Sequence, residues 1–288
     1  MTGWSEEADR FGQAWRLQLR MATVLYQERT AHQELVLFEN PLFGRVLALD
    51  GIVQTTERDE FFYHEMLVHV PLLTHGRAER VLIVGGGDGG ALEELFKHEG
   101  IRQATLVELD AGVIEFSRNY LQAICGQAFE DPRLELVIAD GLAWMREQRG
   151  ARPPYDVILI DSTDPVGPGE VLFTEAFYAD CAALLAEDGL LVTQNAVPFT
   201  EPESLAAPVA ALRKSFAETR CYRVAVPSFF GGDMIFVLAG QTAAALEAAP
   251  EELERRFAAA GLTTRYYAPA VHSGAFALPP YVAELIGD

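Results

Sequence analysis

The segment DSTDPVGPGE, residues 161–170, places two aspartates three positions apart directly after an apolar run. Two prolines and two glycines follow within eight residues, which makes the segment unsuitable for a protein core. A helix start is the alternative because Asp and Ser favour N-caps, but the prolines argue against a helix beginning there at once. We therefore expect Asp161 and Asp164, with Ser162 and Thr163 between them, to lie in a loop that covers a site for a cation.

A second chemical signal is the glycine-rich segment VGGGDGG, residues 84–90. Gly85, Gly87 and Gly90 satisfy the spacing GxGxxG, which alone fits an NAD enzyme, a flavoprotein or a methyltransferase-like nucleotide site. An apolar run precedes the loop and a helical pattern follows it, which favours a nucleotide site over a tight turn without a ligand.

An acid, Asp88, stands in the middle of this glycine loop. In a methyltransferase the loop lies beside the α-carboxylate of S-adenosylmethionine, an anion that loop amides and a helix N-terminus stabilise. Two like charges in contact repel by about 4 kcal/mol at an intermediate effective dielectric constant. Asp88 therefore favours a ligand whose tail is cationic and has no carboxylate. Decarboxylated S-adenosylmethionine satisfies this as a co-substrate, and we expect no tightly bound cofactor.

Polar residues also end the apolar runs that follow. Glu108 comes about twenty residues after the loop, where an acid accepts hydrogen bonds from both ribose hydroxyls of a nucleotide. For Asp110, a solvent-exposed acid at the end of a strand is a credible alternative. Asp140 could accept from an adenine amino group while Gly141 lets the base lie close, although an Asp-Gly pair alone is typical of a turn.

Residues elsewhere in the chain complete the predicted site. Gln54, Tyr63 and His64 precede the glycine loop, and Phe229 follows much later. Carboxylates at the two ends of a pocket and aromatic surface between them suit an alkyl diamine, which is the predicted small-molecule substrate. Clustered carboxylates are also typical of metal sites. Because the sequence does not show ligands that converge on one point, we predict no metal.

These residues need a fold that brings the ends of strands together. Apolar runs alternate with segments long enough for helices, which predicts an α/β, Rossmann-like fold of the class I methyltransferase type, with a mostly parallel sheet covered on both faces. Ligands bind beyond the carboxyl ends of such strands. The Ala-rich segment 242–261 is predicted to be a helix. The predicted strands are 81–84, 104–109, 134–139, 156–161, 190–195, 223–228 and 234–239.

The N-terminal part has a different pattern. Residues 22–56 hold short apolar segments separated by turn-forming pairs such as Asp50-Gly51, which predicts a small domain of antiparallel strands and hairpins. A helical pattern follows over residues 57–76. The predicted domains are an N-terminal β domain with a connecting helix over residues 1–70 and a Rossmann-like catalytic domain over residues 71–288.

Composition argues against several classes of partner. The chain has 288 residues, half of them hydrophobic, and a net charge of −20. Such a surface repels nucleic acid and anionic lipid and is compatible with a cationic substrate, although solubility alone would also explain it. The N-terminus does not resemble a signal peptide, no apolar run reaches the ~18 residues of a membrane span, and three widely spaced cysteines favour a reducing compartment. We expect a cytoplasmic protein that binds neither nucleic acid nor membrane.

Together these motifs resemble the polyamine aminopropyltransferase family, and in particular its bacterial spermidine synthases. The resemblance implies a homodimer or homotetramer. It also implies transfer of the aminopropyl group of decarboxylated S-adenosylmethionine to a primary amine of putrescine or a similar diamine, which yields spermidine and methylthioadenosine. The matching segments span nearly the whole chain and are HQELVLFEN, GRVLALDGIVQTTERDEFFYHEM, VLIVGGGDGG, VELD, ADG, DSTDPVGPGEVLFTEAFY and RYYAPAVHSGAFALP.

The resemblance also implies roles for individual residues. Asp161 corresponds to the family's proton acceptor, and Tyr63 to a tyrosine beside the attacking amine. The implied amine-binding positions are His64, Asp88 and residues 161–164. The implied nucleoside-binding positions are Gln33, Glu108, Asp140, Gly141 and Pro168.

One segment departs from the family pattern. Pro227-Ser228-Phe229 stands where the family commonly has Pro-Thr-Tyr, so a hydroxyl near the amine is lost. Asp233 adds a carboxylate that is not expected there. Both changes leave the reaction type alone, but they leave the preferred amine open between putrescine, cadaverine, agmatine and a triamine.

Three other functions are weighed against this one. An S-adenosylmethionine-dependent methyltransferase shares the fold but would release adenosylhomocysteine and a methylated acceptor. A non-catalytic nucleotide-binding or regulatory protein would not need Tyr63, Asp88 and Asp161 together. An NAD oxidoreductase would leave the two aspartates of residues 161–164 without a role.

Overall fold

The computed structural model describes residues 3–7, 17–162, 171–229 and 231–288 of the chain. Its larger part is built round a seven-stranded sheet with the order β12-β13-β11-β10-β7-β8-β9. The strands from β11 to β9 are parallel, and β13 pairs antiparallel with both β11 and β12. The predicted mostly parallel sheet is therefore confirmed. The strands are β7 (Arg80–Gly85), β8 (Gln103–Glu108), β9 (Leu134–Ile138), β10 (Tyr155–Asp161), β11 (Leu185–Gln194), β12 (Glu218–Val224) and β13 (Met234–Gly240).

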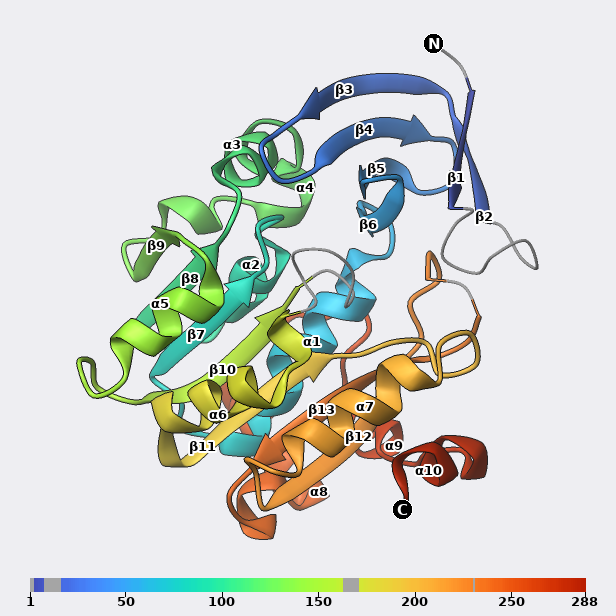
Figure 1. The fold of residues 1–288 in the computed structure, drawn as a ribbon. Helices are drawn as coiled ribbons and strands as arrows, with labels where there is room; N and C mark the ends of the chain where they lie inside the picture. Colours follow the sequence, from blue (N-terminus) through green and yellow to red (C-terminus); the bar gives the residue numbers. More distant parts are fainter. Residues whose placement is uncertain (1–2, 8–16, 163–170, 230) are drawn as a thin grey trace.

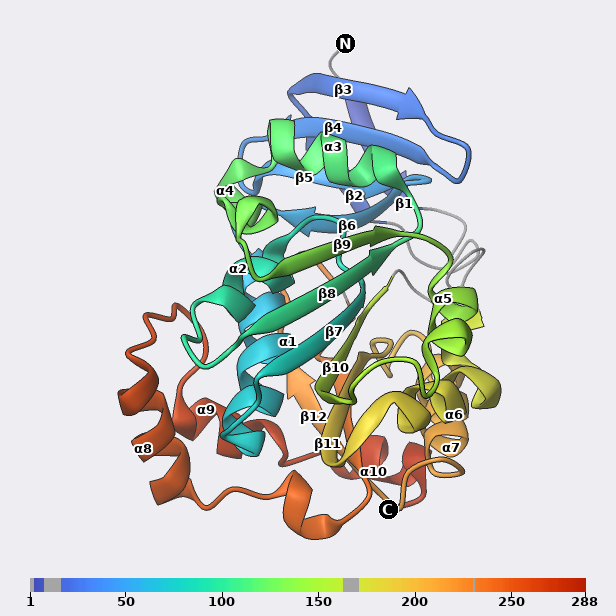
Figure 2. The ribbon, with the colours of Figure 1, turned by 90° about the vertical axis from the view of Figure 1, so that its left-hand side faces the viewer.

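Helices cover both faces of this sheet (Figures 1 and 2). Alternate residues of one strand pack on opposite sides: Val81 and Ile83 contact the apolar cluster of α1, α2, α8 and α9, and Leu82 contacts that of α5, α6, α7 and α10. None of the helices in the described ranges is long and apolar enough to cross a membrane. The helices are α1 (Glu60–His75), α2 (Gly90–Phe96), α3 (Ala111–Tyr120), α4 (Gln122–Cys125), α5 (Gly141–Gln148), α6 (Glu175–Leu184), α7 (Glu203–Leu212), α8 (Pro250–Ala260), α9 (Pro269–Ala275) and α10 (Pro280–Ile286).

The N-terminal part forms the predicted antiparallel β structure, drawn in blue in Figure 1. Asp50 and Gly51 both have positive φ, 49° and 83°, and they join β5 to β6 as a two-residue hairpin turn. One face of the four-stranded sheet, which carries Leu35, Leu37, Leu47 and Leu49, packs on α3 and α4 (Figure 2). The strands are β3 (Thr23–Arg29), β4 (Glu34–Asn40), β5 (Gly44–Leu49) and β6 (Ile52–Thr56), with a separate pair β1 (Gly3–Glu7) and β2 (Leu17–Met21).

The expected domain boundary at residue 70 falls inside α1. Met66, Leu67 and Val70 of this helix are fully buried in the same cluster as strands of the large sheet. The helix therefore packs as part of the larger unit. We propose that the division between the two domains lies in the short connection between β6 and α1.

The strand predicted over 190–195 begins earlier, at Leu185, and two other predicted elements also have different bounds in the structure. The strand expected over 223–228 ends at Val224, because Pro227 has no N–H to donate and residues 226–229 form a turn. The helix expected over 242–261 is a short 3₁₀ turn followed by α8, which begins only at Pro250. A residue before proline disfavours the helical conformation, and Ala249 is extended with ψ of 146°.

Candidate active site

One pocket lies where the carboxyl ends of β7, β8 and β10 meet the small β domain. Apolar side chains from both parts, among them Leu47, Leu49 and Val84, form part of its wall. Thr163, Asp164 and Pro168 lie outside the described residues. All other predicted site residues line this pocket: Gln33, Gln54, Tyr63, His64, Gly85, Gly87, Asp88, Glu108, Asp140, Gly141, Asp161, Ser162 and Phe229.

The glycine loop packs closely against other parts of the protein. Gly85 has a φ of 84°, and a Cβ there would lie 2.1 Å from the carbonyl oxygen of Asp161. A Cβ at Gly90 would lie 2.2 Å from the ring of His64. Gly86 N–H also donates to the Asp161 carbonyl at 2.7 Å. The glycines thus bring the loop against the backbone of Asp161 and the ring of His64, two residues that the sequence assigned to the amine.

Asp161, at the end of β10, is positioned by a tyrosine. Its Oδ1 accepts a hydrogen bond from the hydroxyl of Tyr63 at 2.8 Å. The Tyr63 ring is held edge-on by Phe236 and Phe229, at centroid distances of 5.0 and 6.3 Å. The other oxygen, Oδ2, is buried and has no hydrogen-bond partner among the described residues. Asp161 is therefore oriented by one oxygen and has the other available to accept a proton or a hydrogen bond.

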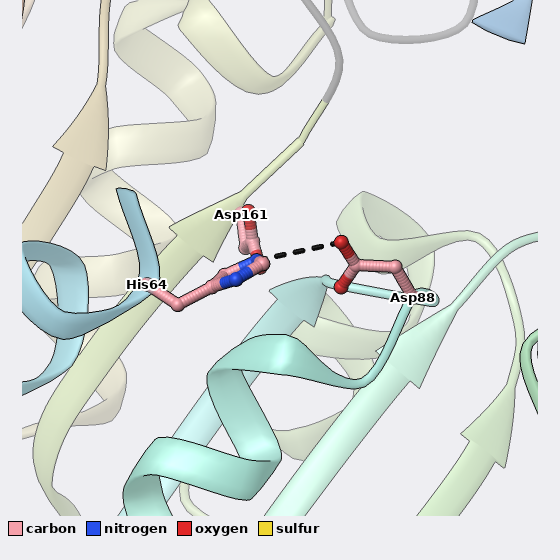
Figure 3. A group of neighbouring side chains, drawn as sticks. All are labelled: His64, Asp88 and Asp161. Carbon is pink, nitrogen blue, oxygen red and sulfur yellow. Dashed lines mark ion pairs between the residues drawn. The ribbon is translucent and has the colours of Figure 1, made fainter. Parts of the chain in front are cut away.

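A buried imidazole joins Asp88 to α1. His64 Nδ1 lies 2.8 Å from Glu60 Oε2, one helical turn earlier, and His64 Nε2 lies 3.4 Å from Asp88 Oδ2. Asp88 Oδ1 also accepts from Gly90 N–H, at the start of α2, at 3.0 Å. Figure 3 shows His64 on α1, Asp88 on the loop before α2 and Asp161 at the end of β10, turned toward one another.

The charges of this cluster depend on one another. Burial disfavours an imidazolium, but Asp88 and Glu60 outweigh it and raise the pKa of His64 well above its usual value. Burial likewise opposes ionisation of Asp88, and the positive His64 outweighs it and lowers the pKa of Asp88. Burial, helped by the negative charge of Asp88, raises the pKa of Asp161 to about 6. Three carboxylates around one imidazolium leave the cluster net negative, which favours a cationic ligand.

The other end of the pocket carries the residues expected to bind a nucleoside. Glu108 Oε1 accepts from the N–H of Asp110 at 2.9 Å, and burial raises the pKa of Glu108 to about 7. Asp140 caps α5, because its Oδ1 accepts from Ala143 N–H at 2.8 Å. A Cβ at Gly141 would lie 2.8 Å from Val84, so only glycine leaves the wall of the pocket undisturbed.

The structure locates two acids that the sequence did not assign to the site. Asp110 is not a solvent-exposed strand-end acid: it is 5% exposed and caps α3 through Gly112 N–H. Asp233 is not among the described residues that line the pocket, and it forms an ion pair with Arg223 at 2.8 Å. The extra carboxylate is therefore absent from the described lining.

Sequence reasoning missed several polar residues of the site. Glu60 could have been found, because it precedes His64 by four residues on a predicted helix. Asp59 is buried and accepts from Ser228 N–H at 2.7 Å, which fixes the turn that carries Phe229. Gln194 donates to the carbonyl of Ser162 at 2.9 Å. No local sequence pattern predicts the contacts of Asp59 and Gln194, because their partners lie far away in the chain.

Comparisons with known proteins agree with this geometry. Residues 60–248 match the family model described as spermine/spermidine synthase domain, and residues 3–57 match the model described as spermidine synthase tetramerisation domain. A polyamine aminopropyltransferase of Ruegeria sp. (strain TM1040) is 49% identical, with 98% of each chain covered. One of Serratia proteamaculans is also 49% identical and covers 96% of this chain and 94% of its own.

Solved structures give the same result. A spermidine synthase in complex with the transition state analogue AdoDATO has a TM-score of 0.92 and 39% identity, over 99% of this chain and 95% of its own. The spermidine synthase from Thermotoga maritima has a TM-score of 0.88 and 37% identity, over 99% and 94% of the two chains. The chain belongs to the spermine/spermidine synthase family, the polyamine aminopropyltransferases.

Proposed function

We propose that this enzyme transfers the aminopropyl group of decarboxylated S-adenosylmethionine to a primary amine of putrescine or a similar diamine. The products are spermidine, or the corresponding analogue, and methylthioadenosine. The observation that carries the proposal is the cluster of buried His64 with partly buried Asp88 and Asp161 at one end of a pocket. The other end of this pocket holds Glu108 and Asp140. A cationic tail and a nucleoside fit these two ends.

The reaction is a nucleophilic displacement at carbon. The nitrogen lone pair of the amine forms a C–N bond to the propyl carbon next to the sulfonium, the C–S bond breaks, and its electron pair stays on sulfur. The nitrogen must lose one proton. Asp161 is the group we assign to accept it, because its Oδ2 is buried and unpartnered within the described residues while Tyr63 orients the other oxygen.

The raised pKa of Asp161 makes this proton transfer less unfavourable. An amine like that of lysine titrates at about 10.4 and a free aspartic acid at about 3.9, a gap worth about 9 kcal/mol. With the pKa of Asp161 at about 6, the gap falls to about 4.4 units, or about 6 kcal/mol. The neighbouring sulfonium and desolvation lower the pKa of the amine further, and orientation of the reactants contributes the rest.

His64 has a different role from the one that the family resemblance implies. Both of its ring nitrogens already have carboxylate partners, and as an imidazolium it has no lone pair for an ammonium group. We propose that His64 holds Asp88 in place, and that Asp88 faces the ammonium of decarboxylated S-adenosylmethionine. Gln54 and Phe229 would then contact the methylenes and the far end of the diamine.

The product identifies the reaction. The enzyme is incubated with decarboxylated S-adenosylmethionine and, in turn, putrescine, cadaverine, agmatine or spermidine, and the products are identified by mass spectrometry. We expect an aminopropylated amine and an equimolar amount of methylthioadenosine. Ordinary S-adenosylmethionine serves as the control and should give neither product. A methylated acceptor with adenosylhomocysteine would instead make the protein a methyltransferase.

The same assay should be run in the presence of a chelator. The possible ligand atoms of His64, Asp88 and Asp161 lie within 4.8 Å of one another, a spacing that a metal ion could also use. We expect the same turnover after dialysis against EDTA, because an amine and not a metal is the proposed occupant. Loss of activity that Mg²⁺ or Zn²⁺ restores would reassign these three side chains.

The pH dependence should follow Asp161. This residue must be ionised to accept a proton, so kcat/KM should fall as the pH drops below about 6, the pKa of Asp161 in the free enzyme. Asp88→Asn removes a negative charge that raises this pKa, but it also removes the main partner that keeps His64 positive, and positive His64 lowers the pKa of Asp161. These two effects oppose each other, so the wild-type profile is the test, and an acidic limb far from pH 6 would mean that a group other than Asp161 controls it.

We also propose that the chain assembles into a homotetramer, or at least a homodimer, through its N-terminal β domain. The match of residues 3–57 to a tetramerisation domain supports this. A cytoplasmic location is proposed as well, since Cys125, Cys181 and Cys221 are free, buried thiols.

A further inference from the structure

A carboxylate at the nucleoside end of the pocket, Asp110, connects the two domains. Its Oδ2 accepts from the hydroxyl of Thr30 at 2.7 Å and from Nε2 of Gln33 at 3.3 Å, both in the turn between β3 and β4. Its Oδ1 accepts from Gly112 N–H at 2.9 Å and caps α3. A single buried side chain therefore joins the start of α3 to a turn of the small domain.

The Thr30 hydroxyl both accepts hydrogen bonds within its own turn and donates one to Asp110. It accepts from the N–H groups of His32 and Gln33, each at 3.1 Å, and so shapes the turn. A hydroxyl has one proton, and the charged Asp110 oxygen at 2.7 Å is closer than the Gln33 carbonyl at 3.2 Å. The proton therefore points across the domain boundary to Asp110.

Asp110 also decides which atom of the Gln33 amide is free. An ionised carboxylate only accepts hydrogen bonds, so the amide nitrogen must face it, and the amide oxygen is left to accept from a ligand. The N–H of Asp110 meanwhile donates to Glu108 at 2.9 Å. Gln33 and Glu108, which line the same pocket, are thus both oriented by one residue.

We propose that Asp110 and Thr30 are positioning residues that hold Gln33 and the β3–β4 turn against the nucleoside and so set the affinity for the aminopropyl donor. This inference rests on the proposed function, in which that donor is decarboxylated S-adenosylmethionine. The domains have other attachments. Leu37 and Phe116 belong to an apolar cluster between the small sheet and α3, and Arg45 donates to the carbonyl of Tyr120 at the end of that helix. Loss of the Thr30 contact should loosen the turn without separating the domains.

The test is Thr30→Val, which keeps the shape of the side chain and removes the hydroxyl, both as the donor to Asp110 and as the acceptor for His32 and Gln33 N–H. KM for decarboxylated S-adenosylmethionine and Kd for methylthioadenosine should each rise about tenfold, the effect of one hydrogen bond to a charged group. The kcat at saturation should stay within about twofold. Thr30→Ser keeps the hydroxyl and should restore both constants. Thr23→Val, an exposed threonine at the other end of β3, is the matched control and should behave as wild type.

Asp110→Asn gives a second, independent variant. The Asn side chain retains an oxygen that can accept from Gly112 N–H, but it no longer forces the Gln33 amide into one orientation. KM for decarboxylated S-adenosylmethionine and Kd for methylthioadenosine should therefore rise in this variant too. Unchanged binding in Thr30→Val, equal impairment of Thr30→Ser, or a fall in kcat with unchanged KM would each overturn the inference. Because methylthioadenosine binding is measured by calorimetry without turnover, these outcomes differ from failure of the proposed function, in which the wild-type enzyme forms no aminopropylated amine.

Discussion

Replacing Asp161 with Asn should lower kcat by about a hundredfold or more, which is the usual loss for a general base. The structural reason is that Asp161 combines a buried, unpartnered Oδ2 with an Oδ1 oriented by Tyr63, at the end of the strand that the glycine loop contacts. Asn has nearly the same shape and accepts from Tyr63, but it cannot take a proton from an amine. Steady-state kinetics with saturating amine and donor measure the effect.

Two comparisons separate loss of the base from loss of the site. Asp161→Asn should bind methylthioadenosine within about threefold of wild type, because the nucleoside end of the pocket is unchanged. Tyr63→Phe, which leaves the carboxylate and removes the hydrogen bond that orients it, should lose less than Asp161→Asn. If Asp161→Asn turned over at a rate near wild type, Asp161 would have no part in proton transfer.

The sheet was predictable from the sequence because its strands are buried on both faces. An uninterrupted apolar run such as residues 81–84 is typical of a central strand that helices cover on both faces. Acids such as Glu108 and Asp140 follow such runs and indicate the carboxyl edge of the sheet. The strand over 223–228 was misplaced because a strand's ends depend on hydrogen bonds, not on hydropathy. Here the N–H of Ser228 donates to Asp59 instead of to a neighbouring strand.

The site was predictable as a set of residues but not as a set of contacts. The fold brings His64 of α1 and Asp88 of the glycine loop together, and no sequence spacing encodes that pair. The same holds for Thr30 and Asp110, which are 80 residues apart and lie in different domains. The sequence left a solvent-exposed acid open as an alternative for Asp110, because a carboxylate at a strand end is usually exposed unless a second domain covers it.

Replacing Asp88 with Asn should weaken decarboxylated S-adenosylmethionine by roughly ten- to a hundredfold and methylthioadenosine by less than about threefold. A charge pair at contact distance is worth about 4 kcal/mol at an intermediate effective dielectric constant. The imidazolium of His64 already offsets part of the Asp88 charge, so we expect about 1.4–2.7 kcal/mol to be lost. Methylthioadenosine has no ammonium group and should be insensitive to this charge.

Calorimetric titration of both ligands into wild type and Asp88→Asn measures the difference. Asn at this position can still accept from Gly90 N–H, so the glycine loop should keep its conformation. Ordinary S-adenosylmethionine is the third ligand, and its disadvantage relative to the decarboxylated form should shrink in the variant, because its carboxylate no longer meets a negative charge. Equal losses for decarboxylated S-adenosylmethionine and methylthioadenosine would mean that Asp88 only maintains the loop, and that selection of the cationic donor comes from Asp161 or from the segment beyond it.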